Sequence, residues 1–399
     1  MSKGSLTISE LLGAGSYGTV HSATDGTGRR LAVKKMYGDK NGVPCPLEVS
    51  IMNTLSHPNL NGAIGVYYDK RSLQILQERA ESDLYQKVNK KSIDLSLARK
   101  WCHGIAQAVK VLHHQMIIHA DIKAGNILYF GDDDIRLTDF TLSVIKWREG
   151  DMFRQVAGTA THCPLECLEK RPWDESLDIW ELGCTFYHII FGQLLFPRQM
   201  GIGKDKSKYI NCILEWDKLG YVPETCDRKP SGAYTGPVIS PSMDDPKYQL
   251  ATDLICKMLV VEQSKRITID QVLNHPFFKG LVKKGYRYHN PKKALLNSRQ
   301  TSRFSEVGNE IVIKSCREIV TDLALIIYRR YISSSLRSSR LVIYTSFWIA
   351  HKMVTGTTPS LIKGISLSQV LEKEAFVCNL LSFRLHPPIL QKDVRKSLQ

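Results

Sequence analysis

The segment at residues 119–140, HADIKAGNILYFGDDDIRLTDF, restricts the fold and the chemistry of this chain more than any other part. Asp121, Lys123 and Asn126 fall within six residues, and Asp139 follows thirteen residues after Asn126. Two carboxylates, an ammonium group and an amide thus fall between residues 121 and 139.

A glycine-rich turn lies near the N-terminus, where residues 13–20 read GAGSYGTV, a G-x-G-x-x-G-x-V pattern. Glycines allow the backbone to approach nucleotide phosphates closely, because a side chain at those positions would obstruct the approach. Alone this pattern is a weak signal, since glycine-rich turns are common. The predicted nucleotide-binding residues here are Leu12, Gly13, Ala14, Gly15, Ser16, Tyr17, Gly18, Thr19 and Val20.

Two charged residues follow this turn at regular intervals. Lys34 ends the strand-like stretch Ala32-Val33-Lys34, fourteen residues after Val20, and Glu48 comes another fourteen residues on. The residues after Glu48 place their apolar side chains on one helical face. A glutamate on such a helix can pair with Lys34 and hold the lysine against phosphates. The alternative for each residue is an ordinary exposed charge.

Together these motifs make residues 6–278 resemble a eukaryotic-type protein kinase, and Lys123 within DIKAGN resembles the serine/threonine class. GVP before Glu48, SHPNL after it and DIWELGC at 178–184 resemble the cyclin-dependent group. The resemblance implies an α+β bilobal protein-kinase fold with a β-rich small lobe and a helical large lobe. It also implies ATP and Mg²⁺ as cofactors and a protein substrate phosphorylated on serine or threonine.

The resemblance assigns a role to each matching residue. Asp121 corresponds to the catalytic base, Lys123 to the group that stabilises the transferred phosphoryl, and Lys34 with Glu48 to the pair that orients the α- and β-phosphates. The metal ligands are Asn126 and Asp139, Asp83 is a ribose contact, Gln77 lies at the back of the adenine pocket, and Glu166, Arg266 and Asp178 are structural.

Two positions depart from the family pattern. Ala120 stands where many kinases carry an arginine that binds a phosphate on the activation segment, and residues 144–157 contain no Ser, Thr or Tyr. We therefore predict that activity does not require phosphorylation of that segment. Thr141 replaces a glycine and stiffens the backbone there. A pseudokinase scaffold is the alternative, although every lysine, base and metal position is retained. THC at 161–163 leaves a preference for proline in the substrate in doubt.

The C-terminal third is more basic than the rest of the chain. Of the formal net charge of +15, residues 281–399 carry 20 Lys and Arg against 7 Asp and Glu. Residues 279–308 read as a basic linker, and 309–390 resemble a single cyclin box, a small all-α domain. The resemblance places Lys352 and Glu374 at a contact with the kinase, within one chain or between chains. The alternatives are a helical extension, or a basic module for nucleic acid, which we do not favour.

Composition sets the remaining expectations. The 43% apolar and 23% charged residues are an ordinary globular balance, and ten cysteines without paired spacing are typical of reduced intracellular thiols. The longest strongly apolar run, 341–350, is far shorter than the roughly 20 residues that span a bilayer. We expect a soluble intracellular protein without a membrane contact, and nothing in the sequence distinguishes nucleus from cytoplasm.

Overall fold

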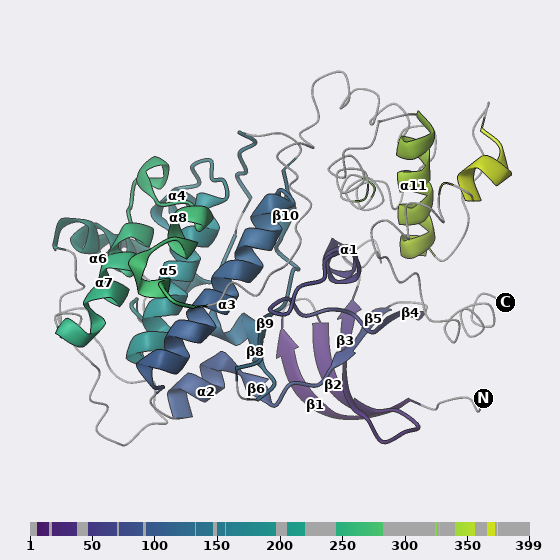
Figure 1. The fold of residues 1–399 in the computed structure, drawn as a ribbon, viewed down its shortest axis with the longest axis horizontal. Helices are drawn as coiled ribbons and strands as arrows, with labels where there is room; N and C mark the ends of the chain where they lie inside the picture. Colours follow the sequence, from purple (N-terminus) through teal and green to yellow (C-terminus); the bar gives the residue numbers. More distant parts are fainter. Residues whose placement is uncertain are drawn as a thin grey trace. The chain divides into compact units, whose positions relative to one another are not determined.

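The structure, a computed structural model, divides into two compact units that are described separately here (Figure 1). The first unit holds residues 1–56, 60–79 and 287–399, and the second holds 57–59 and 80–286. The residues that the structure describes are 6–15, 18–37, 47–69, 72–90, 93–131, 133–146, 150–155, 157–196, 206–219, 245–281, 324, 327, 340–355, 365–371 and 373.

The N-terminal part of the first unit forms a five-stranded antiparallel sheet and a short helix, α1 (Leu47–Thr54). Its strands are β1 (Thr7–Gly15), β2 (Gly18–Thr24), β3 (Arg30–Tyr37), β4 (Gly65–Asp69) and β5 (Ser72–Glu78), in the spatial order β1-β2-β3-β5-β4. Alternating apolar residues of neighbouring strands bury one face, with a core of Ala23, Leu31, Val33 and Leu76. This agrees with the strands predicted over 6–80 and the helical stretch near 45–55.

The second unit is mainly helical. Its helices are α2 (Leu84–Lys90), α3 (Leu95–His114), α4 (Leu165–Leu168), α5 (Ser176–Phe191), α6 (Lys206–Leu219), α7 (Gln249–Met258) and α8 (Ile269–Leu273). Five short strands form two small sheets: β6 (Ser82–Asp83), β8 (Ile127–Tyr129) and β9 (Ile135–Leu137) in one, β7 (Ile117–Ile118) and β10 (Val144–Ile145) in the other. Nearly every residue of α5 is buried, so this helix forms the centre of the unit.

The amphipathic repeat in 98–114 produces α3 as predicted. An Asp94 side chain caps its first turn by accepting a hydrogen bond from Ser96 N. The predicted apolar face is buried, with Ile105, Ala108 and Leu112 at 0% exposure, and burial extends beyond this face to every residue from Trp101 to Val109. The α+β arrangement of a β-rich unit and a helical unit is thus confirmed.

The C-terminal part is described mainly through helix α11 (Arg340–Thr355). Residues 342–350 of this helix are all buried, as predicted for a helix that is apolar nearly all round. The hydroxyls of its buried Thr345 and Ser346 are satisfied within the helix, because Thr345 donates to Leu341 O and Ser346 to Val342 O. Glu374, the side chain of Lys352, and most of the predicted linker lie outside the described residues.

Two observations bear on the expected cellular setting. Within the described residues, no helix is both long enough and apolar enough to cross a membrane. The described cysteines Cys102, Cys163, Cys167, Cys184 and Cys256 carry free thiols. Cys212 in α6 is disulfide-bonded, so the expectation of reduced thiols throughout is wrong at this position.

An almost solvent-free ion pair joins α4 to the segment that precedes α8. Arg266 Nη1 lies 2.5 Å from Glu166 Oε1, and Nη2 lies 2.9 Å from Oε2. The guanidinium also donates to three backbone carbonyls, those of Val260, Val261 and Ser176. With 0% and 1% of the side chains exposed, neither charge has water as an alternative partner.

We expect Glu166→Ala to lower the free energy of unfolding by on the order of 3–5 kcal/mol, because it leaves the Arg266 charge buried without its carboxylate. Urea or thermal unfolding measures this loss. Glu169→Ala is the matched control, because its pair with Arg171 is about half exposed and such pairs contribute less than about 1 kcal/mol. Equal losses in the two variants would contradict this account of the buried pair.

Candidate active site

Side chains of helix α5 hold the backbone of residues 119–122 through hydrogen bonds. The Asp178 carboxylate is fully buried and accepts hydrogen bonds from His119 N at 2.9 Å, Ala120 N at 2.8 Å and His113 Nε2 at 2.8 Å. Ala120 has a φ of 62°, a left-handed conformation that costs a non-glycine residue about 1–3 kcal/mol. The hydrogen bonds from the His119 and Ala120 amides to Asp178 offset that cost and fix the backbone position of the next residue, Asp121.

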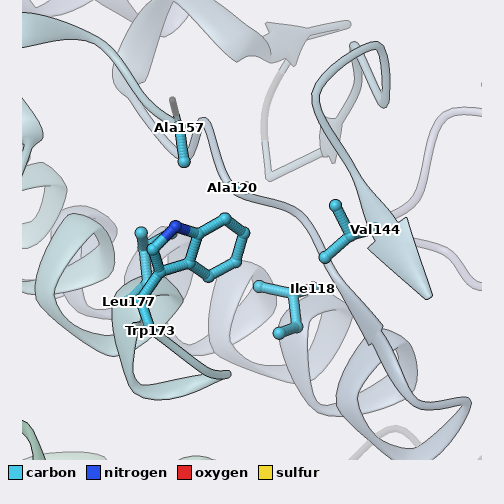
Figure 2. Packing of buried hydrophobic residues seen from close by; sticks show 6 residues of the cluster. All are labelled: Ile118, Ala120, Val144, Ala157, Trp173 and Leu177. Carbon is cyan, nitrogen blue, oxygen red and sulfur yellow. The ribbon is translucent and has the colours of Figure 1, made fainter. Parts of the chain in front are cut away.

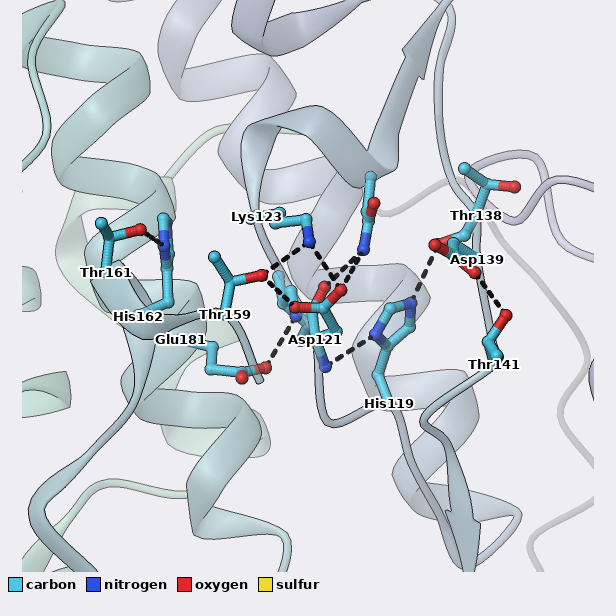
Figure 3. A network of polar contacts seen from close by, with 12 residues as sticks. His119, Asp121, Lys123, Thr138, Asp139, Thr141, Thr159, Thr161, His162 and Glu181 are labelled. Carbon is cyan, nitrogen blue, oxygen red and sulfur yellow. Dashed lines mark hydrogen bonds and ion pairs between the residues drawn. The ribbon is translucent and has the colours of Figure 1, made fainter. Parts of the chain in front are cut away.

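Asp121 is the centre of a compact polar network (Figure 3). Its Oδ2 accepts hydrogen bonds from Lys123 Nζ at 2.7 Å and from Asn126 Nδ2 at 2.9 Å. The structure therefore brings together the three residues that sequence spacing placed in one site. Asp121 is only 7% exposed, so this network also replaces most of the hydration of its carboxylate.

A fourth member of this network, Thr159, was missed by the sequence analysis. Its hydroxyl lies 2.6 Å from Asp121 Oδ1 and also 2.6 Å from Lys123 Nζ, so it can donate to the carboxylate and accept from the ammonium (Figure 3). Thr159 thereby ties the chain before α4 to the catalytic loop. The only sequence signal is that Thr159 is the first hydroxyl-bearing residue after the hydroxyl-free stretch 144–157.

Asn126, a predicted magnesium ligand, uses its side-chain nitrogen and not its oxygen in its hydrogen bonds with described residues. Both hydrogen bonds that this side chain makes with described residues are donated by Nδ2, to Asp121 O and to Asp121 Oδ2. The amide oxygen is therefore left to accept a cation. Among the described residues, no three His, Cys, Asp or Glu side chains form a metal cage by themselves. This donor set fits Mg²⁺, which is usually bound through one or two protein oxygens together with substrate phosphates and water.

Asp139, the second predicted ligand, is held by the residue that departs from the family pattern. Thr141 Oγ1 donates to Asp139 Oδ1 at 2.7 Å (Figure 3). Asp139 has a φ of 66°, a left-handed conformation that aspartate tolerates better than most residues. Thr141 thus affects more than backbone stiffness, because its hydroxyl also orients this carboxylate.

The first unit, which holds the five-stranded sheet and is called the small-lobe unit from here on, contains the ion pair that the sequence predicts. Lys34 Nζ lies 2.8 Å from Glu48 Oε1 and 2.9 Å from Oε2, and Glu48 is 1% exposed. Lys34 lies on β3 opposite Val20 of β2, so the end of the glycine-rich hairpin is next to the lysine. Burial excludes the alternative of an exposed surface glutamate for Glu48.

The glycine-rich hairpin places Leu12, Gly13, Ala14 and Gly15 at the end of β1 and Gly18, Thr19 and Val20 at the start of β2. A Cβ on Gly18 would lie 2.1 Å from Lys35 O, so strand packing alone requires glycine at this position. A Cβ on Gly13 or Gly15 would meet nothing within 4 Å among the described residues, so packing does not require glycine at those two positions. Ser16 and Tyr17 lie outside the described residues.

Two further residues that were predicted to lie at the nucleotide site, Asp83 and Gln77, form hydrogen bonds with nearby residues of the protein. Asp83, in the helical unit, accepts hydrogen bonds from Gln86 N at 2.7 Å and from Gln86 Nε2 at 3.0 Å, at the start of α2. Gln77 accepts from Asn61 Nδ2 at 2.7 Å within the small-lobe unit. These bonds explain why both residue types suit their positions independently of a nucleotide.

Ala120 lies in an apolar cluster rather than at a charged site (Figure 2). The cluster consists of Ile118, Ala120, Val144, Ala157, Trp173 and Leu177, and it is called the Trp173 cluster below. Phe153 and Trp173 exchange two backbone hydrogen bonds at 2.8 and 2.9 Å, and Trp173 Nε1 donates to Gln155 O at 3.0 Å. The stretch 153–157 is therefore anchored by apolar packing and backbone pairing.

His162 adds a neutral ring near this network. Burial lowers its pKa from the usual value to about 3, helped by the charges of His188 and Lys123. The ring is therefore uncharged at physiological pH, and its Nδ1 pairs with the Thr161 hydroxyl at 2.9 Å. No positive charge is added beside Lys123.

Comparison with known proteins agrees with this geometry. The protein-family model of the protein kinase domain matches residues 6–278, more than half of the chain. The chain belongs to the protein kinase family. The second unit of this kinase therefore corresponds to the helical part of the family fold and the five-stranded sheet to its β-rich part.

Several curated kinases are similar to this one. An Aurora kinase of Debaryomyces hansenii is 29% identical over 280 residues, which cover 68% of this chain and 61% of the relative. Mitogen-activated protein kinase spk1 of Schizosaccharomyces pombe is 26% identical, with 67% and 76% covered. Calcium-dependent protein kinase 17 of Arabidopsis thaliana is 30% identical, with 69% and 50% covered. The kinase thus spans about half to three quarters of the length of these relatives.

Proposed function

We propose that this chain is a Mg-ATP-dependent protein serine/threonine kinase. The observation that carries the proposal is the buried network in which Asp121 is bound by Lys123, Asn126 and Thr159. A carboxylate held this way, with little exposure, is positioned to accept the proton of a substrate hydroxyl. The printed names of the relatives, which include a protein named as a serine/threonine-protein kinase, support the same substrate class.

The other site residues have distinct roles in this proposal. The Lys123 ammonium is placed to stabilise charge on the phosphoryl group as the group moves to the hydroxyl. Lys34, fixed by Glu48, would bind the α- and β-phosphates, while Asn126 and Asp139 would hold Mg²⁺. Magnesium, when bound, neutralises charge on the phosphate oxygens. The hairpin residues 12–20 and Asp83 would contact the nucleotide.

We expect the purified chain to transfer phosphate from ATP to Ser or Thr in a peptide library, and Asp121→Asn to lower kcat by about 10²–10⁴-fold, because a general base contributes that much. Radiolabelled transfer measures the rate, and ATP titration checks that nucleotide binding persists. Asp133→Asn is the matched control, since that aspartate is half exposed and pairs with Lys100. A wild type without transfer would instead identify a pseudokinase scaffold, and an Asp121→Asn variant as fast as an active wild type would contradict Asp121 as the base.

We also propose that the activation segment is ordered without a phosphate. The Trp173 cluster supports this, because Ala120, at the position of the phosphate-binding arginine, is a fully buried member of that apolar cluster. Paired backbone at Phe153 and Trp173 adds two hydrogen bonds that need no covalent modification.

Phosphatase treatment is therefore expected to leave the transfer rate unchanged, with no phosphate found on residues 144–157 by mass spectrometry. Ala120→Arg is expected to reduce both stability and rate, since it forces an unpaired cation into an apolar cluster. An inactive dephosphorylated protein, or an Ala120→Arg variant that gains activity on phosphorylation, would overturn this proposal.

For the C-terminal region we propose a kinase domain at 6–278, a basic linker at 279–308 and a cyclin-like activator at 309–390. The full burial of 342–350 in α11 supports a packed helical element. Residues 287–399 also belong to the compact unit that carries Lys34 and Glu48, which supports an action through the small lobe. A linker of about 30 residues would give an effective concentration on the order of millimolar.

We expect Lys352→Glu and Glu374→Lys each to lower kcat by about tenfold at unchanged folding, because each reverses a charge at the proposed contact with the kinase. Lys363→Glu serves as the matched charge reversal. Truncation after residue 285 is expected to lower the rate further. Full activity in all three altered proteins would reject the activator. Binding of residues 281–399 to DNA or RNA that weakens steeply with salt would favour a nucleic-acid module instead.

A further inference from the structure

One face of α5 binds the catalytic loop through three side chains, of which the family pattern accounts for Asp178 alone. Glu181 and Thr185 follow Asp178 by three and seven residues, a spacing that places all three on the same helical face. Glu181 Oε2 accepts a hydrogen bond from Ile122 N at 2.7 Å. The Thr185 hydroxyl lies 2.8 Å from Glu181 O and 3.2 Å from Ile122 O and shares its proton between these two carbonyls. The peptide groups on both sides of Ile122 are therefore held directly after Asp121.

The other oxygen of Glu181 faces the activation segment. Glu181 is fully buried, and its Oε1 has no hydrogen-bond partner among the described residues. A Cβ on Gly158 would lie 2.5 Å from this oxygen, so the carboxyl packs directly against the Gly158 backbone. Gly158 has a φ of 77° and precedes Thr159, whose hydroxyl binds Asp121. The Glu181 side chain thus contacts two segments that contribute to the network around Asp121: the catalytic loop at Ile122 and the activation segment at Gly158.

The charge state of Glu181 follows from its surroundings. Burial raises its pKa well above the ordinary value, and the charges of Asp178 and Asp121 raise it further, while the bond from Ile122 opposes the shift. The titratable groups that face it are Asp178 and Cys184 on α5, Asp121 in the catalytic loop, Cys163 and Cys167 near α4, and Tyr209 on α6. All of them are carboxyls, thiols or a phenol, so these surroundings favour the protonated, neutral form of the carboxyl.

We propose that Glu181 is a positioning residue that fixes Asp121 and Thr159 relative to each other. The inference rests on the proposed kinase activity, because Asp121 is the group whose position matters for transfer. A neutral carboxyl accepts the Ile122 amide without adding a negative charge beside Asp121. An alanine at position 181 would leave the Ile122 amide without its acceptor and leave space beside Gly158. Asp121 and Thr159 would then no longer be fixed by the same side chain.

Three variants of the full chain test the proposal. Glu181→Gln keeps a neutral acceptor of the same size, and Glu181→Ala removes the acceptor. Leu182→Ala is the matched control, because Leu182 is fully buried on the same helix and carries no polar group. We expect Glu181→Ala to lower kcat by about 10–100-fold with little change in KM for ATP, since small misplacements of reacting groups cost this much. Glu181→Gln is expected to stay within about threefold of wild type, and Leu182→Ala to lower Tm without this loss of kcat.

Hydrogen exchange gives a readout that is independent of activity. We expect the peptide containing Ile122 to exchange faster in Glu181→Ala than in wild type, Glu181→Gln or Leu182→Ala. Stability gives a second one. Because the folded protein keeps a proton on Glu181 that the unfolded chain loses above its ordinary pKa, wild type loses stability as pH rises from 5 to 8. The Tm difference between Glu181→Gln and wild type is therefore expected to grow over that range.

A wild type without phosphate transfer would reject the proposed function, while hydrogen exchange and the Tm difference would still decide the role of Glu181. Glu181→Ala with wild-type kcat and unchanged exchange at Ile122 would overturn the positioning role. Glu181→Gln as slow as Glu181→Ala, or a Tm difference that does not change with pH, would overturn the account in which the carboxyl acts as a neutral acceptor.

Discussion

The arrangement of the active site depends on the hydrogen bonds between the buried Asp178 carboxylate and the amides of His119 and Ala120. A catalytic loop has little regular structure of its own, so its backbone amides need partners from elsewhere. Helix α5 supplies these partners because it is buried along almost its full length and cannot easily shift. The position of Asp121 therefore reflects the rigidity of the core of the helical unit, and the loop inherits that rigidity.

The same core explains how the activation segment is held. In a kinase that orders this segment with a phosphate, the ordering free energy comes from charge-assisted hydrogen bonds. Here Trp173, packed with Ala120 and Ala157, supplies apolar burial instead. Apolar burial is less directional than a phosphate contact and cannot be reversed by a phosphatase. Under the proposed mode of control some other means of regulation is needed, and the C-terminal region is the one proposed above.

Much of the site follows from the sequence, because short-range spacing determines which residues meet in a tight loop. The grouping of Asp121, Lys123 and Asn126 and the pair between Lys34 and Glu48 are of this kind. Strand and helix periodicity likewise predicts the β-rich and helical units.

Thr159 and Glu181 were beyond the reach of that reasoning, since they approach Asp121 and Ile122 from 38 and 59 residues away in the chain. Nothing in a local pattern indicates such contacts, which arise only when α5 and the activation segment pack on the loop. Gly18 shows the converse difficulty, because a motif glycine read as a phosphate contact is also demanded by the Lys35 carbonyl. Asp83 likewise caps a helix in addition to its expected role.

The bond from Thr141 to Asp139 has a consequence for small-molecule inhibitors. Compounds that bind only after residues 139–141 turn over would have to break this hydrogen bond and rotate a β-branched residue that lacks the freedom of glycine. Compounds that bind to the conformation in which this hydrogen bond is formed do not have to break it. Selectivity between this kinase and relatives with glycine at that position is therefore expected to come from the backbone at 141 rather than from the adenine pocket.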